Sequence, residues 1–150
     1  MLHTLKLLNY PVVCGVALAG FLLGWLWYSP LLFVRPWIKE MKFAEADLKM
    51  KPSKGVMMMV CALLMNVVST AVIAVLITEH QMLVEGHPSL GALGGAKVGL
   101  FVGAGLVAIR HATNHMFQMK SFKLFLIVAG YDVALCTLQG ALLGQWLWPK

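Results

Sequence analysis

Two charged residues interrupt otherwise apolar stretches of the sequence and are the first candidates for chemistry. Arg110 and Asp132 lie in consecutive apolar segments that are joined by a short polar turn. Charged groups in apolar surroundings are costly, and they usually pair with one another or face a cavity. Counting from the turn at about 1.5 Å of helix per residue places Asp132 roughly one turn deeper than Arg110. We therefore predict an Arg110–Asp132 ion pair, with Tyr131 and His111 nearby, that either fixes helix register or handles ions or protons.

Sulfur and imidazole side chains recur at helical spacing and form a second candidate site. Met57, Cys61 and Met65 are four residues apart in one apolar segment, and His111 and His115 have the same spacing in another. Thioether, thiolate and imidazole ligands suit Cu(I) or a haem iron. Methionine is also a common filler of apolar helices. We therefore expect no cofactor and keep copper or haem binding at these residues as the alternative.

Familiar catalytic patterns are absent from the sequence. It contains no phosphate-binding glycine loop, no nucleophile elbow and no zincin helix. Of its six acidic residues only Asp132 falls within an apolar segment, so the paired carboxylates of a hydrolase are missing as well. We therefore expect a protein that is not an enzyme.

Composition indicates which elements must position these residues. The chain has 150 residues, of which 60% are apolar and 12% are charged, whereas soluble domains have about 45–50% and about 25%. Four stretches, at about 10–34, 55–78, 90–117 and 124–148, reach the roughly 20 apolar residues that span a bilayer. Only helices satisfy the backbone of such stretches in lipid. We predict an all-α bundle of four transmembrane helices, in a single domain covering residues 1–150.

The positive charges are concentrated in two of the expected connections. The loop at 35–54 contains six Lys and Arg residues and the third loop contains Lys120 and Lys123, whereas Lys6 and Lys150 fall on the opposite side. Eight cations against two place both loops in the cytoplasm and both termini outside, as in a bacterial cytoplasmic membrane. This distribution suits anionic lipid, and we exclude nucleic acid as a partner.

The loop at 35–54 also has helical periodicity, and the segment before it is rich in aromatic residues. Apolar residues at Trp37, Ile38, Met41, Ala44 and Leu48 alternate with charges. This pattern predicts a short amphipathic helix in the membrane interface. The predicted interfacial anchor consists of Trp27, Tyr28, Pro30 and Trp37.

Glycines at four-residue spacing form three helix faces: Gly95, Gly99 and Gly103; Gly20 and Gly24; Gly140 and Gly144. Small residues let helices approach closely in lipid, where no hydrophobic force drives their association. These faces pack either within the bundle or against another copy or subunit. We expect a non-catalytic packing component, as a homo-oligomer or as a subunit of a membrane complex. The alternative is a small transporter or channel with Arg110 and Asp132 in a polar path.

Two motifs resemble those of a known family. The run from Leu26 to Phe33 (LWYSPLLF), followed by Trp37 and by Asp47-Leu48, is similar to its opening signature. The runs 123–126 (KLFL) and 129–131 (AGY), followed by 140–141 (GA), are similar to its fourth span. The family is catalogued as domain of unknown function 1761. The resemblance implies a fold of four membrane-spanning helices and carries no catalytic residue onto this chain.

Overall fold

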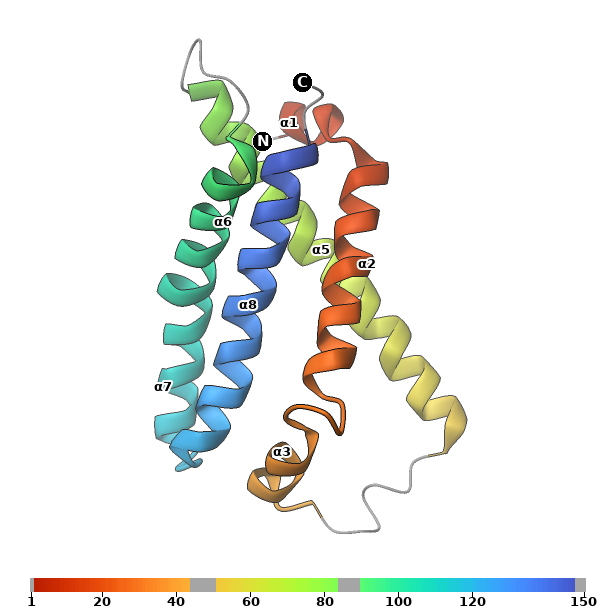
Figure 1. Ribbon diagram of the computed structural model, residues 1–150, viewed down its shortest axis with the longest axis vertical. Helices are drawn as coiled ribbons and strands as arrows, with labels where there is room; N and C mark the ends of the chain where they lie inside the picture. The colour runs from red at the N-terminus through yellow and green to blue at the C-terminus, as the bar shows by residue number, and fades with distance from the viewer. Residues whose placement is uncertain (1, 44–50, 84–89, 148–150) are drawn as a thin grey trace.

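The computed structural model describes residues 2–43, 51–83 and 90–147, and all regular structure in these ranges is helical (Figure 1). The predicted all-α class is therefore confirmed. The elements are α1 (Leu2–Leu7), α2 (Tyr10–Trp27), α3 (Val34–Met41), α5 (Pro52–Leu83), α6 (Gly91–Val102), the π-helical segment η1 (Gly103–Ala108), α7 (Ile109–Phe117) and α8 (Phe122–Trp146).

Four helical stretches are long and apolar enough to cross a membrane: Tyr10–Trp27, Pro52–Leu83, Gly91–Phe117 and Phe122–Trp146. They match the four predicted spans in place, but the first is shorter and the second longer than predicted. Helix α5 has 32 residues, well beyond the roughly 20 needed to span a bilayer. It is inclined against the other helices in Figure 1, and a tilted span needs more residues.

The first span is shorter than predicted because the chain turns after Trp27. Pro30 has no backbone N–H, and the hydroxyl of the buried Ser29 accepts a hydrogen bond from the N–H of Leu31 at 3.3 Å. The chain then enters α3, which covers only the first part of the predicted interfacial helix. Residues 44–50 of that prediction, including Ala44 and Leu48, lie outside the described residues. The short helix α1 was not predicted.

Helix α8 lies at the centre of the bundle, in contact with α2, α3, α5, α6, η1 and α7. The continuous stretch from α6 to α7 runs alongside α8 and α2 lies on its other side, whereas α5 crosses behind them, with its C-terminal end near α6 (Figure 1). Helix α1 and the ends of α2 and α8 meet at one end of the molecule; α3 and the turn between α7 and α8 lie at the other. The side of the membrane that each end faces remains a prediction.

Backbone meets backbone along the interface between α6 and α8. A methyl group added to Gly95 would lie 2.0 Å from the carbonyl oxygen of Gly140, and one on Gly99 would lie 2.0 Å from that of Cys136. A methyl group on Gly144 would lie 2.4 Å from the carbonyl oxygen of Gly91. No side chain fits at these positions, so glycine is required for the observed distance between the two helices.

The remaining glycine face, on α2, also contacts the rest of the chain. A methyl group on Gly20 would lie 2.7 Å from the Leu135 side chain, and one on Gly24 would lie 2.8 Å from the hydroxyl oxygen of Tyr131. All three faces are thus used inside one chain. Association with another copy or subunit stays a prediction, and these glycines no longer support it.

Candidate ligand-binding pocket

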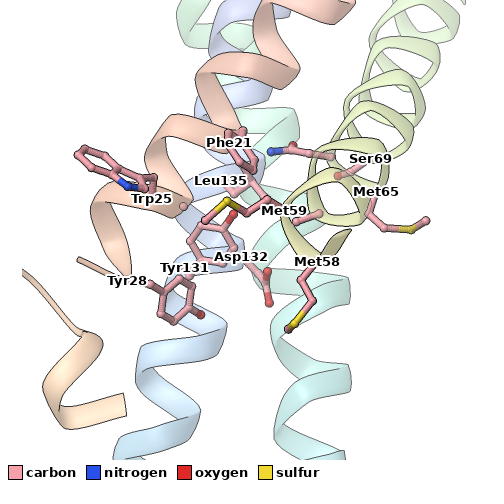
Figure 2. Close-up of a pocket in the computed structure, with 13 residues that line it drawn as sticks. Phe21, Trp25, Tyr28, Met58, Met59, Met65, Ser69, Tyr131, Asp132 and Leu135 are labelled. Carbon is pink, nitrogen blue, oxygen red and sulfur yellow. The ribbon is translucent and has the colours of Figure 1, made fainter. Parts of the chain in front are cut away.

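A pocket of about 690 Å³ lies between α2, α5 and α8 (Figure 2). Helix α2 supplies an aromatic and glycine wall, α5 supplies a methionine-rich wall, and α8 supplies Tyr131, Asp132 and Leu135. Its other lining residues are Phe21, Gly24, Trp25, Tyr28, Met58, Met59, Ala62, Met65, Asn66 and Ser69. Sequence reasoning identified several of these residues separately but predicted no cavity.

The divergence of α5 from α2 opens this pocket sideways. Figure 1 shows α5 leaning away from the other helices toward its N-terminal end. At the rim, Trp25 is 69% exposed and Met65 is 67% exposed, and in Figure 2 both point away from the centre of the cavity. Met59 extends from α5 into the gap between the helices. The rim at Trp25 and Met65 therefore opens onto the flank of the bundle, the surface that lipid would cover.

Asp132 lines this pocket and is paired with a histidine. Its Oδ2 atom lies 2.9 Å from Nε2 of His111. The predicted partner was Arg110, and that prediction is wrong: Arg110 is exposed and lines a separate small cavity together with His111 and Asn114. His111, which we expected nearby, is the observed partner, and Tyr131 lines the same pocket as Asp132.

The change of partner has its cause in η1. A π-helical turn closes i→i+5 hydrogen bonds and accommodates one more residue than an α-helical turn. Residues after η1 are therefore displaced by about one position around the helix. In a regular α-helix Arg110 would continue the face that carries Gly99 and Gly103; with the π turn His111 takes that place. His115 follows on the same face and packs edge-on against Phe125 of α8, with ring centroids 5.8 Å apart.

A buried cluster of uncharged polar side chains joins α5 to α8 at one end of the pocket. Nε2 of the fully buried Gln139 donates to Oδ1 of Asn66 at 2.6 Å and to Oγ1 of Thr70 at 2.8 Å. Ser69 donates to Oε1 of Gln139 at 3.4 Å. We call Asn66, Ser69, Thr70 and Gln139 the polar clamp. It was missed from sequence, although an Asn and a Gln within apolar spans are a usable signal for interhelical hydrogen bonds.

Aromatic residues of the predicted interfacial anchor pack inside the protein. Nε1 of Trp27 donates to the carbonyl oxygen of Ile127 at 3.1 Å. The Tyr28 ring lies edge-on to both Tyr131 and Trp37, at centroid distances of 5.4 and 5.6 Å. Pro30 is exposed. These contacts fix the end of α2 against α8 and α3, and they bring Tyr28 to the pocket; the anchoring role at a lipid interface is untested.

The two predicted metal-binding stripes lie apart. Met57 and Cys61 are exposed on α5, at the end that diverges from the bundle in Figure 1. His111 is engaged by Asp132, and Nδ1 of His115 lies 3.0 Å from the carbonyl oxygen of His111. Within the described ranges no three His, Cys, Asp or Glu residues are grouped to hold a metal ion. Among the five residues of the predicted metal site, only Met65 lines the pocket.

The fold and the site together define a class: an all-helical protein with four potential membrane spans and a lateral pocket that contains one acidic residue. Within that class the chain belongs to the family described as protein of unknown function DUF1761, whose sequence model matches residues 11–144. The expected membership is therefore confirmed. Neither a curated protein nor a solved structure gives a significant match to the chain.

Proposed function

We propose that this chain is a multi-pass membrane protein that binds a small lipophilic molecule from the bilayer and acts as a non-catalytic carrier or receptor for it. The observation that carries the proposal is the pocket between α2, α5 and α8, with Asp132 in its wall. The transporter alternative that sequence suggested is thus preferred, with Asp132 and His111 in place of Arg110. A packing component has lost its main support, because all three glycine faces make contacts within the chain.

The size and lining of the pocket support this proposal. Small-molecule sites have volumes of about 300–1,000 Å³, mostly apolar walls and a few polar groups that orient the ligand. Here the apolar part consists of aromatic and methionine side chains. The polar groups are Tyr28, Asn66, Ser69, Tyr131 and Asp132. They come from all three helices, so a ligand bound among them would bridge α2, α5 and α8.

The lateral mouth supports uptake of the ligand from lipid. A molecule dissolved in the bilayer can enter between α2 and α5 without crossing either end of the bundle. Methionine side chains at the entrance adapt to different shapes, because they are unbranched and polarisable. On this basis a lipophilic ligand, which concentrates in the bilayer, is a better match than a water-soluble one.

The proposal is tested by filling the pocket. Ala62 lines it, so Ala62→Trp places an indole ring in the space for a ligand. The matched control is Val60→Trp, which adds the same ring at an exposed position of α5 outside the pocket. In lipid nanodiscs, saturable binding of the neutral fluorescent hydrophobe 1-aminoanthracene should weaken at least tenfold in Ala62→Trp only. Non-saturable uptake, unchanged by Ala62→Trp, would contradict the proposal.

We also propose a membrane polarity with α3 and the α7–α8 turn in the bacterial cytoplasm. Eight Lys and Arg residues in the two connections at that end, against two near the termini, support this polarity. An alkaline phosphatase fused after residue 150 should be active, because that enzyme folds only outside the cytoplasm. A fluorescent protein fused there should stay dark if it is exported through the general secretion route. The reverse pair of results would overturn the polarity.

A further inference from the structure

We propose that the ligand of this pocket is a lipophilic organic cation, a hydrophobic amine or an onium ion, held by the carboxylate of Asp132. This inference rests on the proposed function and specifies its substrate class. It is carried by the combination of one acidic residue, several aromatic rings and the absence of cationic side chains among the described residues that line the cavity.

The charge of the pocket favours a cation. Asp132 is the one lining residue with a formal charge in the described part of the chain. Arg110, the residue predicted to pair with Asp132, lines the other small cavity together with His111. A carboxylate in apolar surroundings is costly without a partner of opposite charge. An organic cation entering from lipid supplies that partner, whereas an anion would be repelled.

The histidine leaves the carboxylate available for a ligand. Nε2 of His111 lies 2.9 Å from Oδ2 of Asp132, and an imidazole that donates its Nε2 proton there as a neutral group would leave the negative charge on the aspartate. No side chain in the described ranges donates to the other oxygen, Oδ1. His111 therefore orients the carboxylate from the α7 side while the pocket lies on the α2 and α5 side (Figure 2).

The aromatic lining adds a second attraction that is specific for cations. The rings of Phe21, Trp25, Tyr28 and Tyr131 line the pocket. Aromatic faces attract a desolvated cation within about 6 Å of the ring centroid, and they also bind its apolar substituents. Quaternary ammonium groups are recognised in this way. The same walls have no comparable attraction for an anion of equal size.

The test compares two probes that differ mainly in the sign of their charge. Tetraphenylphosphonium and tetraphenylborate are both large tetraphenyl ions, the first a cation and the second an anion. With the full chain in nanodiscs of zwitterionic lipid, we expect saturable binding of tetraphenylphosphonium and at least tenfold weaker binding of tetraphenylborate, by calorimetry. Asp132→Asn should weaken cation binding at least tenfold. Glu40→Gln, the same change at an acidic residue of α3 outside the pocket, should leave it unchanged.

A second pair of variants covers the case in which Asp132→Asn does not fold. Met65→Lys introduces a positive charge at the exposed rim of the pocket, and Leu64→Lys introduces it at an exposed position of α5 outside the pocket. Cation binding should fall at least tenfold in Met65→Lys and less than twofold in Leu64→Lys. Equal losses in both would overturn the proposal.

The outcomes separate this inference from the proposed function. If both tetraphenyl ions and neutral 1-aminoanthracene bind with similar affinity, and Ala62→Trp weakens all of them, the pocket binds lipophilic molecules without preference for cations. That result overturns the inference and leaves the proposed function standing. If no probe shows saturable binding that Ala62→Trp weakens, both fail.

Discussion

The two sides of α8 are built in opposite ways. On one side α6 lies so close that carbonyl oxygens of α8 occupy the positions that Cβ atoms on Gly95 and Gly99 would need. On the other side α5 diverges from α2, and a cavity of about 690 Å³ is left between the three helices. The first interface has no room for a side chain; the second has room for a small molecule.

This difference shows how a short chain can be rigid and still contain a binding site. The contact between α6 and α8 depends on dispersion forces between closely spaced backbones. On the side with the pocket, α2, α5 and α8 share a buried apolar core at one end, which includes Val13, Ile77 and Leu143, and they separate around the pocket toward the other end. The α6 side is therefore closely packed along its length, whereas the other side combines a packed end with an open pocket.

The largest effect is expected where backbone meets backbone. In Gly99→Leu a side chain must displace the Cys136 carbonyl, so α6 and α8 have to separate. Overpacked cores lose about 1–3 kcal/mol, occasionally more, and here we expect about 3 kcal/mol or more because rigid backbone is the obstacle. Thermal unfolding in detergent, followed by circular dichroism, measures the loss.

The matched control for this change is Gly15→Leu on α2. No atom lies within 4 Å of a methyl group at Gly15. We expect its midpoint of unfolding to stay within a few degrees of the wild-type value. Equal destabilisation by the two variants would show that close packing is not what distinguishes the α6 side.

A smaller effect is expected from the polar clamp on the opposite side. Gln139→Leu leaves Asn66, Thr70 and Ser69 without their shared partner, at a cost of about 1–2 kcal/mol. Gln145→Leu makes the same change at a residue of α8 outside the clamp and should cost less. Denaturant titrations of both variants give the two free energies of unfolding. If Gln145→Leu cost as much, the clamp would have no special role.

The next largest effect on the free energy of unfolding is expected at the aromatic end of α2. Trp27→Phe removes the hydrogen bond to the Ile127 carbonyl while it keeps an aromatic ring, and we expect a loss of about 0.5–1.5 kcal/mol. Trp25→Phe, at a ring that is 69% exposed, should change the free energy of unfolding by less. Both values come from the same denaturant titrations. A larger loss in Trp25→Phe than in Trp27→Phe would contradict the packing role given to Trp27.

Features set by single helices were predictable from the sequence. Apolar length gave four spans in the right places, and four-residue spacing identified Gly95, Gly99 and Gly103 as one face. Features that depend on how helices cross were not predictable. The pocket arises from the angle between α2 and α5, and the polar clamp requires that Asn66 and Gln139 reach the same depth. No local pattern specifies either.

The wrong partner for Asp132 has a different origin. The depth of the partner along the helix was predicted correctly, since Arg110 and His111 are adjacent in sequence. The direction in which each side chain points around the helix axis was not. The sequence from Gly103 to Ala108 reads as an ordinary apolar helix with two glycines and has no signal that fixes a π turn. One extra residue in that turn exchanges the arginine for the histidine on the face toward α8.

The smallest effect on stability is therefore expected from removing that extra residue. Deletion of Gly105, where an added methyl group would have no neighbour within 4 Å, should convert η1 to regular α-helix and keep His111 facing Asp132. The free energy of unfolding should change by about 1 kcal/mol or less, since an α-helical turn needs one residue fewer than a π-helical turn. Helix α8 has no extra residue to lose. Deletion of Ala134 from it rotates Asp132 relative to the residues that follow, and it should abolish folding. If the two deletions were equally damaging, the π turn would not be the cause of the shift from Arg110 to His111, and the pairing in this pocket would need another explanation.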